Sequence, residues 1–237
     1  MDNASSFPLG LKLYKRLLEE GMIDLETDSI YAKDYYEEGV KDLVYDIAEN
    51  MDTSLIEVSN KLYLVPHLGN TFLIYSNQEL LKDIVLGKYF DIPHLYLAYY
   101  VAITIFCEFY SAENYFRHTK SFVLVGDIVK TITDRLKELN ENEDIERIET
   151  EYQFNIKALY ERWIKLDTYK EDKDDKKQKS QVRFITKVVE FFSKQDILEL
   201  RENDTEVRPT ERLHAIMKHY YAEPGREAAI LSLVRGV

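Results

Sequence analysis

The residues of this chain most able to do chemistry are five histidines and one cysteine. The histidines are His67, His94, His118, His214 and His219. His214 and His219 are five residues apart, whereas two metal ligands on one helical face need a spacing of four. Cys107 has no second cysteine for a zinc site or an internal disulfide, and its apolar neighbours predict a small buried side chain.

Other catalytic patterns are also missing from the sequence. It contains no glycine-rich phosphate loop and no GxSxG nucleophile motif. Carboxylate pairs such as Glu37 with Glu38 are common in an acidic chain, and nothing around them would bury them and shift their pKa values. The sequence therefore predicts no catalytic residue, no metal and no cofactor. An enzyme with an unrecognised active site is kept as a third hypothesis, and it requires a deep pocket lined by titratable groups.

One loop could hold a ligand. The segment 61–80, KLYLVPHLGNTFLIYSNQEL, places Pro-His-Leu-Gly-Asn between two β-rich runs, and His67 would be the residue to test. The favoured interpretation is structural: the loop closes an N-terminal folding element onto the helices that follow.

The segment 181–221 is the most informative about fold. Apolar residues at helical spacing predict a helix that ends near Ser193. Residues 197–200 and 206–208 can then pair as strands, and Thr210 is a good N-cap for a last helix. Helix, turn, β-ribbon and helix in this order predict a winged-helix element.

The N-terminal third predicts a second element of the same kind. Helical periodicity covers residues 7–21, with Gly21 as C-cap, and residues 34–51. Two β-rich runs, 53–58 and 61–65, flank Ser59 and Asn60, which is a hairpin signal. Residues 71–75 offer a third strand.

Between these elements the sequence predicts helices over 78–85, 93–117, 119–139 and 145–166. The run KEDKDDKKQK begins at residue 170 and lacks an apolar anchor, which predicts a solvated linker. The expected fold is mainly α with small β-ribbons (α+β). Its expected domains are an N-terminal winged-helix-like element (1–75), a helical middle region (76–169), a charged linker (170–180) and a C-terminal winged-helix domain (181–237).

Charge and hydropathy narrow the function. The net charge is −12, of which residues 1–169 carry −13, the linker +1 and residues 181–237 zero. An acidic bulk argues against non-specific duplex binding and suits a basic protein partner. The N-terminus has no signal-peptide pattern, and the uncharged run 92–107 is shorter than the roughly 20 residues of a membrane span. We expect a buried core helix there, no membrane partner and a cytoplasmic protein.

Three basic residues of the C-terminal element are candidate contacts to DNA or a partner protein: Arg208, Arg212 and Lys218. The alternative is that the arginines form a solvated face paired with Glu206 and Glu211.

The pattern F…F…I-L-E-L…V-R-P-T-E-R-L…M…Y-Y within 181–221, together with two winged-helix elements flanking helices, resembles the kite subunits. These are the tandem winged-helix proteins of bacterial SMC-type complexes, such as MukE and its relatives in Wadjet plasmid-defence systems. The resemblance implies a non-catalytic protein that forms a homodimer, binds a kleisin, and helps an SMC-like ATPase act on DNA, which it contacts indirectly or weakly. A winged-helix DNA-binding transcription regulator is the alternative function.

Overall fold

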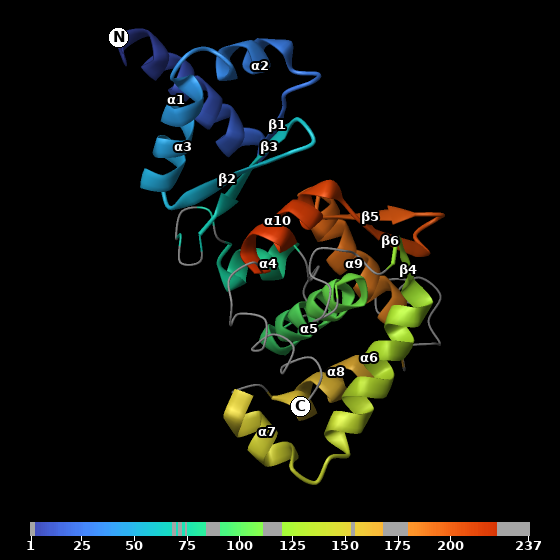
Figure 1. Ribbon diagram of the computed structural model, residues 1–237. Helices are drawn as coiled ribbons and strands as arrows, with labels where there is room; N and C mark the ends of the chain where they lie inside the picture. The colour runs from blue at the N-terminus through green and yellow to red at the C-terminus, as the bar shows by residue number, and fades with distance from the viewer. Residues whose placement is uncertain are drawn as a thin grey trace. The chain divides into compact units, whose positions relative to one another are not determined.

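The computed structural model describes residues 3–67, 70, 73, 75–83, 91–110, 120–152, 155–167 and 180–221. It divides the chain into two compact units, residues 1–74 and 75–237. The fold is mainly helical, with two small three-stranded antiparallel sheets, one in each unit (Figure 1). This is the predicted α+β class.

The N-terminal unit has the element order of a winged helix. Its elements are α1 (Asn3–Glu20), β1 (Met22–Asp24), α2 (Ser29–Tyr35), α3 (Val40–Asn50), β2 (Thr53–Val58) and β3 (Lys61–Pro66). Gly21 ends α1 with φ 74°, and its N–H donates to the Leu17 carbonyl at 2.8 Å, so the predicted C-cap is confirmed.

The predicted ribbon of this unit is also confirmed. Strands β2 and β3 pair from Thr53 with Pro66 to Val58 with Lys61, across Ser59 and Asn60. Both turn residues have positive φ, as a two-residue hairpin requires. The sheet order is β1-β3-β2, so its third strand is β1. The third strand predicted at 71–75 falls largely outside the described residues.

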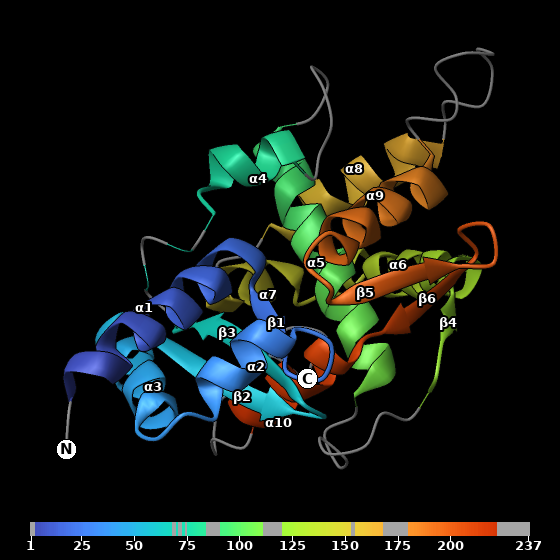
Figure 2. The same cartoon turned by 90° about the horizontal axis from the view of Figure 1, so that it is seen from above.

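The C-terminal unit repeats this plan with an insertion. Its elements are α4 (Asn77–Asp83), α5 (Ile92–Phe109), β4 (Val123–Leu124), α6 (Val125–Asn140), α7 (Ile145–Tyr152), α8 (Ile156–Asp167), α9 (Gln181–Ser193), β5 (Leu198–Arg201), β6 (Glu206–Pro209) and α10 (Glu211–Tyr221). The sheet order β4-β6-β5 matches the order β1-β3-β2 of the first unit (Figure 2). Helices α5, α6 and α9 therefore correspond to α1, α2 and α3, with α7 and α8 inserted before α9.

The predicted C-terminal ribbon and cap are confirmed. Strand β5 pairs with β6 from Leu198 with Pro209 to Arg201 with Glu206. The Thr210 hydroxyl accepts a hydrogen bond from the Leu213 N–H at 3.2 Å, which starts α10.

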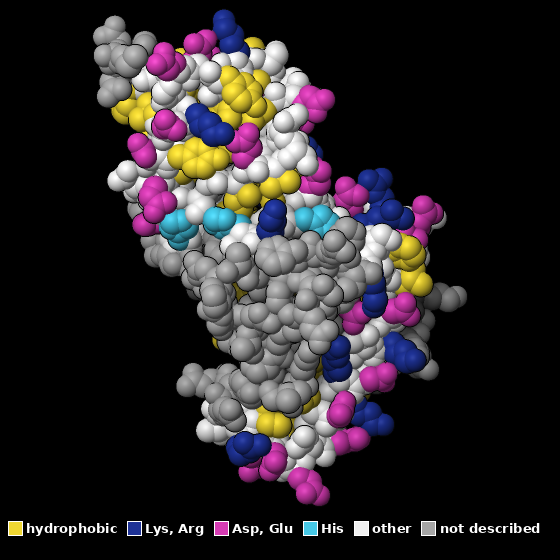
Figure 3. All heavy atoms as spheres, viewed as in Figure 1, with side chains coloured by type: hydrophobic (Ala, Val, Ile, Leu, Met, Phe, Trp, Pro, Cys, Tyr) yellow, Lys and Arg dark blue, Asp and Glu magenta, His cyan; other side chains and the backbone are white. Residues whose placement is uncertain are grey.

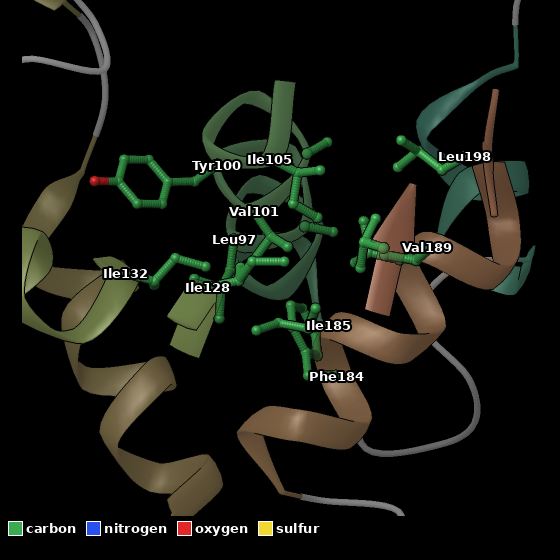
Figure 4. Packing of buried hydrophobic residues seen from close by; sticks show 14 of the residues in the cluster. Leu97, Tyr100, Val101, Ile105, Ile128, Ile132, Phe184, Ile185, Val189 and Leu198 are labelled. Atoms are coloured by element: carbon green, nitrogen blue, oxygen red, sulfur yellow. The ribbon is translucent and has the colours of Figure 1, made fainter. Parts of the chain in front are cut away.

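One hydrophobic core joins the described middle helices to the C-terminal ribbon. Figure 4 shows α5 between α6 and α9. The facing residues are Leu97, Val101 and Ile105 of α5, Ile128 and Ile132 of α6, and Ile185 and Val189 of α9. The described parts of 76–169 and 181–237 thus lie in one compact unit, because α5, β4 and α6 complete the winged helix around α9.

Several helix boundaries differ from the predictions. The helix predicted over 34–51 begins at Val40, after Gly39 at φ 76°, and the separate helix α2 before it was not predicted. The helix predicted over 93–117 ends at Phe109, because Tyr110 is extended. The helix predicted from residue 119 begins at Val125, because Val123 and Leu124 pair with β6 as a short strand. The single helix predicted over 145–166 is two helices, since the Asn155 side chain accepts the Ala158 N–H at 2.8 Å and caps α8. The linker up to residue 179 and the segment after 221 lie outside the described residues.

Candidate functional site

Helix α3 holds the position of a recognition helix, and its outer face is acidic. It buries Val40, Val44 and Ala48, which fixes the opposite face toward solvent. That face carries Asp42, Asp46 and Glu49 at spacings of four and three, all exposed. A helix that enters the major groove needs cations and amides there, so this face is built to repel phosphate. We call these three residues the α3 acidic stripe.

The cations of the N-terminal unit are mostly engaged inside it. Residues 1–74 contain six Lys/Arg and fourteen Asp/Glu, a net charge of −8. Four of the six cations form ion pairs within the unit: Lys12 with Asp34 at 2.5 Å, Lys15 with Glu19 at 3.6 Å, Arg16 with Glu20 at 2.8 Å and Lys41 with Glu57 at 2.8 Å. Few cations of this unit are therefore left to bind phosphate, and its net charge of −8 gives it an acidic field.

The pair of Lys41 with Glu57 ties α3 to the wing. The fully buried Tyr35 also donates its hydroxyl hydrogen to Glu57 at 2.9 Å. The hydrogen bond from Lys41 lowers the pKa of Glu57, with that from Tyr35 adding to it against the effect of burial. Burial and the carboxylate together raise the pKa of Tyr35. This cluster is a structural link between α2, α3 and β2.

Helix α1 presents an apolar stripe to solvent. Phe7, Leu11 and Leu18 lie on one face at spacings of four and seven, with side chains 52%, 44% and 42% exposed. Its other side buries Leu13 and Leu17 in the core of the unit. We call the three exposed residues the α1 apolar stripe. Over the N-terminal unit, Figure 3 shows apolar side chains exposed among Asp and Glu.

The three basic candidates of the C-terminal unit differ in what they contact. Arg208 donates to Glu206 at 2.9 Å and lies over the Phe122 ring at 5.5 Å from its centroid. Arg212 donates to the Gln195 carbonyl at 3.0 Å, which braces the turn after α9. Lys218 is exposed on α10. The predicted pairing of Arg208 with Glu206 is present.

The second wing is acidic at its tip. The turn between β5 and β6 includes Glu202 and Asp204, both exposed, with Asn203 between them. All three have positive φ, and the Thr205 N–H closes the turn onto the Arg201 carbonyl at 3.2 Å. A DNA-contacting wing would carry cations at this point.

The loop around His67 is held by its own unit. The Ser54 hydroxyl and His67 Nε2 are hydrogen-bonded at 2.7 Å, and the His67 N–H donates to the Asp52 carbonyl at 2.9 Å. The buried Asn70 side chain donates to the carbonyls of Met51 and Asp52 at 3.0 Å. These bonds brace the turn between α3 and β2.

A His–Asp–Arg cluster at the start of α5 was not singled out by the sequence. Asp91 is the N-cap: its carboxylate accepts the His94 N–H at 3.4 Å, contacts His94 Nδ1 at 2.6 Å and accepts from Arg162 at 2.8 Å. Burial would raise the pKa of Asp91, but the hydrogen bonds from Arg162 and His94 outweigh it and lower the pKa to about 2. Burial lowers the pKa of His94. The Asp-x-Pro-His spacing of this capping box was the signal.

Among the described residues, no group of three or more His, Cys, Asp and Glu side chains could hold a metal ion. Helix α5 is long and apolar enough to cross a membrane by length and composition, and half of its 18-residue window is buried inside the structure. Its buried residues belong to the core of the C-terminal unit, as predicted for a core helix.

The fold and these surfaces define a protein with two winged-helix elements, the first of which has an acidic outer face on α3. A family model described as a family of unknown function (DUF6063) matches residues 4–237. The chain belongs to this family. No curated protein matches it.

Proposed function

We propose that this chain is a non-catalytic winged-helix subunit that binds a basic protein partner in a DNA-associated complex. The observation that carries the proposal is the α3 acidic stripe. A helix in the recognition position that bears Asp42, Asp46 and Glu49 suits Lys/Arg-rich protein and opposes phosphate.

The α1 apolar stripe supports the same function. Phe7, Leu11 and Leu18 lie on the same acidic unit, and docked interfaces combine an apolar centre with a charged rim. An apolar surface on α1 and an acidic surface on α3 of one small unit favour a macromolecular partner over a small ligand.

The finer proposal is a kite-like role in the cytoplasm. The resemblance of 181–221 to kite subunits names a kleisin and an SMC-like ATPase as the partners, with chromosome maintenance or plasmid defence as the process. Two tandem winged-helix elements support this assignment. The alternative, a DNA-binding transcription regulator, would have to use α9, whose outer face carries Arg183, Lys187 and Lys194. The ion pairs of Glu190 with Arg183 and Lys187, at 2.8 and 3.0 Å, weaken that alternative.

The test is co-purification of the tagged full chain with a kleisin and an SMC-like ATPase of the same organism. We expect a complex that elutes together through gel filtration, and its dissociation when the α3 acidic stripe is changed to lysine. The control changes an exposed acidic triplet of the same spacing, which is Asp134 and Glu138 of α6 and Glu141 at its C-cap. Equal loss of the complex in both triple variants would show that only net charge matters, and no complex at all would reject the kite-like role.

A further inference from the structure

Strand β5 is an edge strand. Among the described residues it pairs with β6 on one side only. The Ile197 carbonyl accepts the Thr210 N–H at 3.2 Å, and the Arg201 carbonyl accepts the Thr205 N–H at 3.2 Å, so alternate residues 197, 199 and 201 point their backbone toward β6. The backbone groups of Leu198 and Leu200 therefore point to the open edge.

On the outer face of this ribbon, acidic and basic side chains alternate along and across the two strands. Glu199 lies opposite Arg208, and Arg201 lies opposite Glu206. Along the strand, Arg201 contacts Glu199 at 2.7 Å. The side chains of Glu199 and Arg201 are 42% and 60% exposed, so both remain accessible to an incoming strand.

The edge opens onto a shallow groove that leaves room for such a strand. It is lined by the end of α9, including Ser193 and Lys194, and by all four residues of β5. The inner face of β5 is already filled, because Leu198 is fully buried in the core. A strand added along this groove could therefore form backbone hydrogen bonds and contact the Glu199–Arg201 pair, as in other cases of strand addition.

We propose that the open edge is occupied by β5 of a second copy of this chain, antiparallel about a two-fold axis at Leu200. In this register Glu199 of each copy lies opposite Arg201 of the other, and the two Leu200 residues exchange backbone hydrogen bonds. The alternating charges of the ribbon continue without a break across the axis. An axis at Glu199 would instead place two glutamates opposite each other.

The other open edge in the described residues does not fit a second copy in this way. Strand β2 is the edge of the N-terminal sheet, and its one charged residue, Glu57, is engaged by Lys41 and Tyr35. Self-pairing there would bring together two units of net charge −8. Because β5 is only four residues long, its pairing buries a small interface and is expected to be weak and reversible.

The experiment is analytical ultracentrifugation of the full chain across a concentration series. The wild type should show a monomer–dimer equilibrium. E199R places arginines opposite each other in both symmetric pairs and should weaken the dimer by about tenfold or more. The quadruple variant E199R/R201E/E206R/R208E reverses the charges of both strands, keeps opposite charges facing each other within the ribbon and across the axis, and should restore the dimer. E138R, an exposed glutamate on α6 with the same charge change, should leave the affinity unchanged.

Three results would overturn the proposal. They are a wild type that stays monomeric at the highest concentration, an E199R variant that dimerises like the wild type, and a folded quadruple variant that does not recover. Circular dichroism confirms that each variant is folded. The measurement needs no partner protein, so its outcome is separate from that of the co-purification test.

Discussion

The hydrogen bond between Trp163 and Thr133 gives the sharpest test of how the C-terminal unit is held together. Trp163 of α8 is fully buried, and its Nε1–H donates to the Thr133 hydroxyl of α6 at 2.9 Å. Thr133→Val keeps the shape and the helix propensity but removes the acceptor. The indole N–H is then buried without a partner, which costs about 1–3 kcal/mol. We expect T133V to destabilise the unit by about 1–2 kcal/mol.

The assay is urea unfolding followed by tryptophan fluorescence. Trp163 is the only tryptophan of the chain, so the signal comes from the C-terminal unit alone. With a slope of about 2 kcal/mol per molar urea, the midpoint should fall by roughly half to one molar. The matched control is Thr186→Val, whose hydroxyl is also buried and donates to the carbonyl four residues earlier, Val182, at 2.7 Å. It should shift stability by under about 0.5 kcal/mol. Equal midpoints for the two variants would refute the reasoning.

Three further predictions concern the fold. Ile185→Ala in α9 should lower the midpoint reported by Trp163 fluorescence by the equivalent of about 2–5 kcal/mol, since both residues lie in one core; a midpoint equal to that of the wild type would contradict this. Gly39→Ala should destabilise its unit by about 1 kcal/mol because φ is +76°, whereas Gly126→Ala in α6 should stabilise its unit by about 0.5–1 kcal/mol. Neither new Cβ would meet an atom within 4 Å, so backbone conformation alone should set the two signs. Thermal melts that shift in the same direction for both variants would contradict this prediction. Asp91→Asn should lower the free energy of unfolding by about 1 kcal/mol at pH 7, a value reduced because the side chain is 48% exposed. Since the pKa of Asp91 falls from 3.8 to about 2 on folding, the difference in stability from the wild type should shrink in urea titrations as the pH drops from about 4 to about 2. A difference that persists in full at pH 2 would show that the charge of Asp91 is not its cause.

Local sequence signals predicted the hairpins and caps well. Ser59 and Asn60 sit at positive φ in the first hairpin, as their types allow, and Thr210 caps the last helix. These features depend on a few neighbouring residues, so a single sequence contains them.

The missed elements depend on contacts distant in sequence. Strands β1 and β4 have three and two residues, too few to show a period of two, and each exists because a hairpin strand pairs with it. The share of α5 and α6 in the second winged helix likewise follows from packing against α9, across an insertion that hides the repeat.

The site was only partly predictable for a different reason. Spacing alone could have revealed the α3 acidic stripe, because Asp42, Asp46 and Glu49 are already at helical intervals. Which cations are free cannot be deduced from spacing. Arg212 was expected near a partner or Glu211, but it donates to the Gln195 carbonyl, and that contact requires the turn between α9 and β5.

The central proposal is that this chain binds protein through the acidic surface of its N-terminal unit and does not bind duplex DNA by itself. Fluorescence anisotropy of a labelled duplex, titrated with the purified full chain at low salt, tests it most directly. The account predicts no saturable binding for the wild type, and measurable, salt-sensitive binding once the α3 acidic stripe is changed to lysine. Tight binding by the wild type with a steep salt dependence would contradict it and support a transcription regulator.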